Sequence, residues 1–203
     1  MKLGTRGLGS VLAAAALATA LAAGAAAQSK PESESLLEAI QEQRGTDVID
    51  LVTRRGRTIV NSRGYSGMTP LTVAMRQRAN QFVNFLLQSG ADPKLPEKGG
   101  DTALMIAARS GNLEGVTTML SVGAAVDATN RQGETALIIA VQNHQSAVAR
   151  KLLEAGASAT RTDSASGLSA RDYAVRDRRS SDILRMIDSI KPKPKFIAGP
   201  VIR

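Results

Sequence analysis

A short pattern of residues recurs along the chain at an almost constant interval, and this repeat limits the possible folds more than any other feature. Copies begin at Gly67, Gly100, Gly133 and Gly167, so successive copies are 33, 33 and 34 residues apart. Each copy has a hydroxyl residue two positions after the glycine and ends in alanine, as in GETALIIA at residues 133–140. A fixed period of this length indicates a stack of structural units, each packed against its neighbours.

Within each copy the sequence predicts two helices joined by a turn. The first helix is expected to begin at the hydroxyl residue, whose oxygen can accept a hydrogen bond from the first turn. These residues are Thr69, Thr102, Thr135 and Ser169. A second apolar stripe follows at helical spacing, as in Val83, Leu86 and Leu87. It is followed by Gly90, Gly123 and Gly156, where a chain that leaves a helix favours a left-handed residue.

This unit resembles the repeat of the ankyrin family. The resemblance rests on Thr69-Pro70-Leu71 followed by Val73-Ala74, on Gly90-Ala91-Asp92, and on the period itself, and it is strongest over residues 67–156. The family pattern has a histidine after the leucine, whereas this chain has Thr72, Met105, Ile138 and Asp172 there. The resemblance implies an all-α fold, an ankyrin repeat solenoid of about five helix-turn-helix units including two caps.

The expected ankyrin repeat domain spans residues 34–190, in units of about 34–66, 67–99, 100–132, 133–166 and 167–190. The first and last units are atypical, as expected for repeats that face water on one side. In the first unit, residues 35–40 and 47–52 are the expected helices and Gly56 is the expected loop glycine. In the last unit, the final helix is expected at residues 182–190.

Residues 1–27 have the features of a secretory signal peptide. Lys2 and Arg6 form a basic head, residues 11–23 are apolar, and three alanines precede Gln28. The apolar run is short for a membrane span, so an uncleaved anchor is the less favoured alternative. We expect a mature protein that begins near Gln28, followed by a linker at residues 28–33. The alanine-rich signal indicates a bacterial source and hence the periplasm.

Charge and composition exclude some classes of function. Without Lys2 and Arg6, 24 basic residues face 18 acidic ones, a net charge of +6 for the mature chain. There are no cysteines, so no disulfide contributes to the fold. The five aromatic residues, Tyr65, Phe82, Phe85, Tyr173 and Phe196, are too few for the stacking platforms of single-strand nucleic-acid binders. Together with the export signal, this argues against a nucleic-acid partner.

The C-terminal tail, residues 191–203, begins with alternating lysine and proline. This alternation favours an extended polyproline conformation. We expect a disordered solubilising tail. Docking of the tail on the stack, on a partner or on an anionic envelope surface is the alternative.

Few residues could support catalysis. The single histidine, His144, falls in a turn between two helices, with no cysteine to pair with it and no serine motif around it. One histidine and scattered carboxylates offer no metal-ligand cluster and no acid–base pair. Gly99-Gly100 lacks the lysine and hydroxyl context of a phosphate loop. We therefore expect no enzyme activity, no cofactor and no metal.

The resemblance instead places a binding surface on the turn tips and first helices, which form a concave groove in ankyrin stacks. Matching each unit to the motif gives the expected partner-binding residues: Tyr65, Met68, Arg76, Gln77, Lys98, Asp101, Arg109, Ser110, Arg131, Glu134, Gln142, Asn143 and Arg176. Arg76, Arg109 and Arg176 share one repeat position, so the groove is expected to be net positive. The alternative is that these arginines are ordinary residues of a solvated helix face.

The sequence also predicts apolar anchors at one end of the groove and two further clusters of charge. Tyr65 and Met68 are expected to be apolar anchors, although Tyr65 could instead pack against its own loop. A second basic cluster consists of Arg54, Arg55, Arg57 and Arg63. The charges at residues 171–185 alternate in sign, which indicates ion pairing on helices.

The expected function is a monomeric periplasmic module that binds an acidic segment of another protein through the concave groove. Any membrane contact would be peripheral. The alternative is an envelope-tethering protein that holds anionic surfaces through its basic charge and C-terminal tail.

Overall fold

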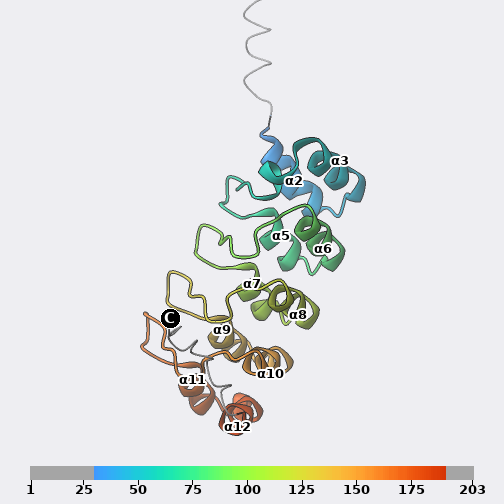
Figure 1. Ribbon diagram of the computed structural model, residues 1–203. Helices are drawn as coiled ribbons and strands as arrows, with labels where there is room; N and C mark the ends of the chain where they lie inside the picture. Colours follow the sequence, from blue (N-terminus) through green and yellow to red (C-terminus); the bar gives the residue numbers. More distant parts are fainter. Residues whose placement is uncertain (1–29, 191–203) are drawn as a thin grey trace, which may run out of the picture. The chain divides into compact units, whose positions relative to one another are not determined.

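The computed structural model describes residues 30–190, and residues 32–190 fold as a stack of helical hairpins (Figure 1). The predicted signal peptide (1–27) and tail (191–203) lie outside the described residues. Within them the chain has eleven α-helices, one 3-10 turn and no named strand. The predicted all-α architecture is confirmed.

Five helical hairpins make up the stack. They pair α2 (Glu32–Gln41) with α3 (Gly45–Arg55), α5 (Pro70–Arg76) with α6 (Asn80–Gln88), α7 (Ala103–Ser110) with α8 (Leu113–Ser121), α9 (Ala136–Gln142) with α10 (Ser146–Glu154), and α11 (Ala170–Arg176) with α12 (Ser181–Ser189). The first helices α5, α7, α9 and α11 pack on one another in chain order. The loops between hairpins project from one side of the stack (Figure 1).

The predicted helix starts are confirmed. Each hydroxyl residue accepts from the backbone N–H three positions later, at 3.2 Å for Thr69, 3.4 Å for Thr102, 3.2 Å for Thr135 and 3.2 Å for Ser169. Thr72 and Asp172, two of the residues in the family's histidine position, also accept from the N–H of Thr69 and Ser169. In these two units the side chains at both positions accept a backbone N–H, which satisfies two donors that the helix itself leaves without a partner.

The core lies between successive first helices. In α9 all six residues from Ala136 to Val141 are buried, because α7 and α11 cover opposite faces of this helix. At the ends of the stack the first helices bury fewer residues: Leu36, Leu37, Ala39 and Ile40 in α2, and Ala170 and Ala174 in α11. An inner unit therefore depends on both neighbours for its hydrophobic stabilisation.

The turns within four hairpins contain a left-handed residue: Gln43, Arg78, Gly111 and His144, with φ of 55°, 55°, 69° and 55°. Glycine adopts this conformation most readily. Two of the three residues other than glycine, Arg78 and His144, contact the following unit through their side chains. Arg78 donates to the carbonyl oxygen of Gly111 at 3.1 Å, and His144 reaches the last unit.

The end units differ in detail from the prediction. Helix α2 begins at Glu32, inside the stretch expected to be a linker. Gly56 ends helix α3 with a positive φ of 59°, as predicted, but the short helix α4 (Arg57–Val60) follows it in place of an extended loop. Helix α4 turns the apolar pair Ile59 and Val60 into the core, where an extended loop would have left them exposed. The last helix begins one residue before the predicted start, after the 3-10 turn η1 (Arg178–Ser180).

The cap of α9 gives a direct test of this fold. Thr135 is fully buried, so replacing it with alanine leaves the N–H of Ile138 without its acceptor. Thr135→Ala should lower the free energy of unfolding by about 1 kcal/mol, measured by urea denaturation. Thr135→Ser is the matched control, because Ser169 fills the same role in the last unit, and it should retain most of the stability. Equal losses in the two variants would show that the hydroxyl is not responsible.

Candidate functional site

The loops between units form closed turns, which we call fingers: residues 64–68, 97–101, 130–134 and 163–168. In each finger, the N–H of the first residue donates to the carbonyl oxygen of the last. The donor–acceptor distances are 3.1 Å from Gly64 to Met68, 2.9 Å from Glu97 to Asp101, 3.1 Å from Asn130 to Glu134 and 3.0 Å from Asp163 to Leu168. The turn tips predicted from the repeat therefore share one geometry.

Neighbouring fingers are joined through the backbone. These bonds run from the N–H groups of Lys98, Arg131 and Ser164 to the carbonyl oxygens of Gly67, Gly99 and Gln132, over 2.9, 3.4 and 2.7 Å respectively. Glycine is required where the fingers meet, because a Cβ on Gly100 would lie 2.9 Å from the backbone nitrogen of Arg131. Main-chain contacts therefore set the spacing of the fingers.

The first finger has no finger before it, and a carboxylate replaces the missing contact. Tyr65 has the same place in its finger as Lys98 in the next, and its N–H donates to Oε2 of Glu34 at 2.9 Å. Glu34 lies in α2, one period before Gly67, whose carbonyl oxygen makes the equivalent bond to Lys98. Glu34 thus ends the ladder of fingers at its N-terminal edge.

Two of the predicted groove arginines are paired with carboxylates at the bases of the fingers. Arg76 donates to both carboxylate oxygens of Glu97 at 3.1 Å, and Arg109 donates to Asp101 at 2.6 Å. The side chains of Glu97 and Asp101 are only 14% and 13% exposed. The positive charge that these arginines bring to the groove is therefore largely offset.

Asn130 links two of the carboxylates. Its Nδ2 donates to Asp101 and to Glu134, each at 2.8 Å, and its Oδ1 accepts from the N–H groups of Gln132 and Glu134. The predicted binding residues Asp101 and Glu134 therefore serve to hold the third finger. Sequence reasoning missed Asn130, although it stands 33 residues after Glu97 and 33 before Asp163.

Asp163 is buried in the last finger and was also missed. Its carboxylate accepts from the hydroxyl of Tyr173 at 2.6 Å and from the N–H of Ser166 at 2.6 Å and of Gly167 at 3.1 Å. Burial would raise the pKa of Asp163, but the hydrogen bonds from Tyr173, Ser166 and Gly167 outweigh it and lower the pKa to about 2. Asp163 therefore stays ionised and fixes the shape of this finger.

The other predicted binding residues differ in how exposed their side chains are and in whether they have partners within the fold. Tyr65 is 76% exposed, which argues against packing on its own loop, whereas Met68 is partly buried against the core. The side chains of Lys98 and Arg131 are exposed and have no hydrogen bond or ion pair within residues 30–190. Four predicted residues, Gln77, Gln142, Asn143 and Arg176, are exposed at the ends of first helices, and Ser110 donates to the carbonyl oxygen of Ala107.

Most arginines of the second basic cluster have a hydrogen-bond or ion-pair partner within the fold. Arg54 pairs with Asp50 and Arg55 with Glu32. Arg63 donates to the carbonyl oxygen of Pro96 at 2.7 Å, which joins the first finger to the base of the second. Near the last unit, Arg171 pairs with Asp188 and Arg179 with Asp177, in agreement with the predicted ion pairing on these helices.

His144 lies in a constellation that sequence spacing did not indicate. Its Nδ1 is 3.2 Å from the hydroxyl of Ser180, and its Nε2 is 3.5 Å from a carboxylate oxygen of Asp177. These residue types resemble a nucleophilic triad, but Ser180 is fully buried, so a substrate has no access to its oxygen. The arrangement connects the turn of the fourth unit to the last unit.

Within residues 30–190, no three His, Cys, Asp or Glu side chains are grouped so as to hold a metal ion. The helices of this part of the chain are all too short or too polar to cross a membrane.

Comparison with known families agrees with this geometry. The family model described as ankyrin repeats (3 copies) matches residues 78–163, which contain α6 to α10 and the second and third fingers. The stack of helical hairpins over residues 32–190 is consistent with an ankyrin repeat solenoid. No curated protein matches the chain. Ankyrin repeats point to a protein–protein interaction module, and this family is generally non-enzymatic.

The low pKa of Asp163 makes a prediction about acid stability. Its folded-state pKa of about 2 lies below the ordinary value of 3.8, so this carboxylate stabilises the fold above about pH 4. The contribution should be lost as the pH falls from about 4 to about 2. Asp163→Asn, the residue found at the equivalent position 130, should reduce the pH dependence of the unfolding free energy in that window. Asp50→Asn, at an exposed carboxylate, is the control, and a wild-type pH profile for Asp163→Asn would contradict the assignment.

Proposed function

We propose that this ankyrin stack acts in the periplasm as a non-enzymatic binding module, which holds an acidic segment of a partner protein on its finger side. The observation that supports this most is the state of Lys98 and Arg131. Both are exposed and have no charged partner among residues 30–190, whereas the neighbouring Arg76 and Arg109 are engaged by carboxylates. Unpaired cations at fixed positions favour an anionic partner, because no internal ion pair must be broken on binding.

The fingers are well suited to recognition. The backbone bonds between them and the buried polar contacts of Asn130 and Asp163 hold them in one arrangement. A rigid surface loses less conformational entropy on association than a flexible one. Tyr65 adds an exposed aromatic side chain next to the cations, of the kind that often contributes most to binding.

The binding proposal is tested by two charge-reversal variants that have the same net charge as each other. The variant Lys98→Glu, Arg131→Glu, Arg176→Glu should lose at least tenfold in affinity for a partner captured from periplasmic extract, or about 1.4 kcal/mol. The control variant Lys94→Glu, Arg150→Glu, Arg185→Glu carries the same charge change at exposed residues away from the finger tips and should still bind. Equal loss in both variants, together with loss on deleting residues 191–203, would favour the envelope-tethering alternative.

The proposed location has its own test. Protein recovered from the periplasmic fraction should have an N-terminus near Gln28, found by intact mass and N-terminal sequencing, because the small residues before Gln28 match a signal peptidase site. A full-length chain in the cytoplasmic fraction would contradict export while leaving the binding proposal open.

A further inference from the structure

We propose that the fingers bind a polyproline-type segment in which an acidic residue recurs at every third position. This inference rests on the proposed function and specifies the chemistry of the partner segment. It follows from the position, charge and spacing of three side chains: Tyr65, Lys98 and Arg131. We call these three residues the finger column.

The finger column has one member in each of the first three fingers. Its residues are 33 positions apart and each is the second residue of its finger. All three side chains are exposed. Because the N–H of Lys98 and that of Arg131 bond to the preceding finger, the main-chain positions from which the two cationic side chains extend are set by the backbone. The column therefore presents an aromatic ring followed by two cations in a regular row.

The finger column borders a cavity whose lining carries a net positive charge. A cavity of about 480 Å³ is lined by Arg63, Gly64, Gly67, Pro96, Glu97, Lys98, Gly100 and Arg131. Glu97 is its one carboxylate, and Arg76 holds both oxygens of that group. Arg63, Lys98 and Arg131 contribute cations without a carboxylate partner among the described residues. The net charge of this hollow favours a ligand with carboxylates.

The spacing of the column selects the conformation of the ligand. Stacked helices lie about 8–10 Å apart, and α5, α7 and α9, each of which follows a finger, pack on one another in this way. A polyproline helix has three residues per turn and rises about 3.1 Å per residue, so residues three apart lie on one side at about 9 Å. Alternate residues of a β-strand are only about 7 Å apart. The polyproline spacing therefore matches successive cations.

The exposed ring of Tyr65 also favours a ligand in the polyproline conformation. Polyproline segments dock on exposed aromatic side chains, because the proline ring packs on the aromatic face. Tyr65 lies one finger before Lys98, so a segment with a proline over Tyr65 would place later acidic residues near Lys98 and Arg131. An α-helical segment with acids seven residues apart would also span about 10 Å. A helix about 10–12 Å wide fits the small hollow less well.

The test uses labelled synthetic peptides and fluorescence anisotropy with the mature protein. One probe has three prolines followed by two glutamates that are separated by a pair of prolines, and a second has the same composition with the two glutamates at alternate positions. A third is an alanine-rich helical peptide with glutamates seven residues apart. We expect the first probe to bind at least tenfold more tightly than either of the others.

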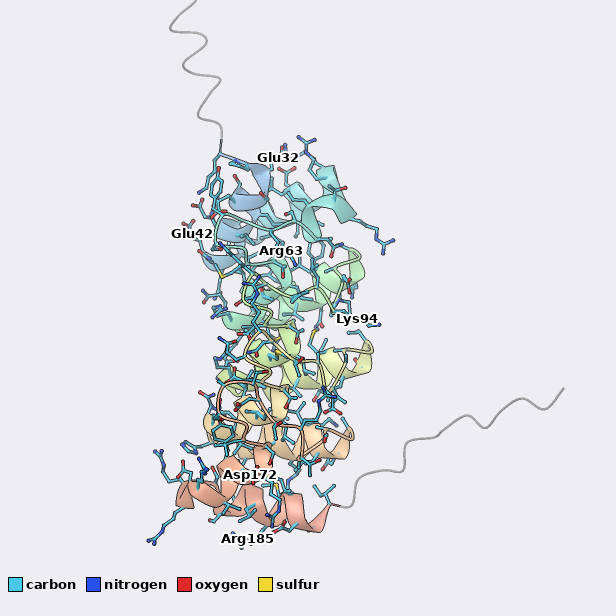
Figure 2. The ribbon with its side chains drawn as sticks, turned by 90° about the vertical axis from the view of Figure 1, so that its left-hand side faces the viewer. Glu32, Glu42, Arg63, Lys94, Asp172 and Arg185 are labelled. Carbon is cyan, nitrogen blue, oxygen red and sulfur yellow. The ribbon has the colours of Figure 1, made fainter. Side chains whose placement is uncertain are left out.

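Matched variants connect binding to the column. Lys98→Gln and Arg131→Gln should each weaken the first probe severalfold. Lys94→Gln should not, because Lys94 is an exposed lysine of the same loop that lies outside the column. In Figure 2, where the loop side of the stack faces the viewer, Lys94 lies at the right-hand margin and Arg63 near the midline. Circular dichroism of each variant verifies that it is folded.

The other outcomes separate this inference from the function on which it rests. Equal binding of the two proline probes would reject the three-residue spacing, while an acidic preference would stand. Tighter binding of the helical probe would reject the polyproline conformation. If no probe binds, yet capture of a partner still depends on Lys98 and Arg131, the ligand class is wrong and the finger-side binding proposal survives.

Discussion

The structure depends on the burial of each first helix between two neighbours. Helix α9 buries six consecutive residues, because α7 and α11 pack on it from the neighbouring units and α10 packs on it within its own hairpin. No single hairpin could bury such a surface by itself, so stability arises from the interfaces between units. Each end unit has a neighbour on one side, and the two end units cover the core in different ways. Helix α4 covers the core with Ile59 and Val60, and the last unit has Arg171 where inner units have a buried leucine.

Polar contacts hold the fingers of the stack in a fixed arrangement. Carboxylates at the bases of the fingers are held by Arg76 and Arg109, while Asn130 and Asp163 satisfy buried groups inside the third and fourth fingers. Most of the charge on this side is therefore used internally. Lys98 and Arg131 are the exceptions that matter for binding, because their exposed side chains have no internal partner within the described residues.

Proximity alone does not make a site, as His144 shows. Its neighbours Ser180 and Asp177 have the residue types of a hydrolytic triad at short distances, yet Ser180 is fully buried. The same contacts explain why a histidine occupies a left-handed turn position in which the preceding unit has Gly111. Anchoring to the next unit compensates for the strain of that backbone conformation.

The sequence by itself determined the repeat and the helix starts at Thr69, Thr102, Thr135 and Ser169, because period and capping are local properties. It also located the fingers that contain Tyr65, Lys98 and Arg131. Only the tertiary structure decided which charges are free. Arg76 meets Glu97 and Arg109 meets Asp101 across loop and helix, and Asn130 joins two units. Such partners are chosen by three-dimensional distance, which residue spacing along the chain does not specify.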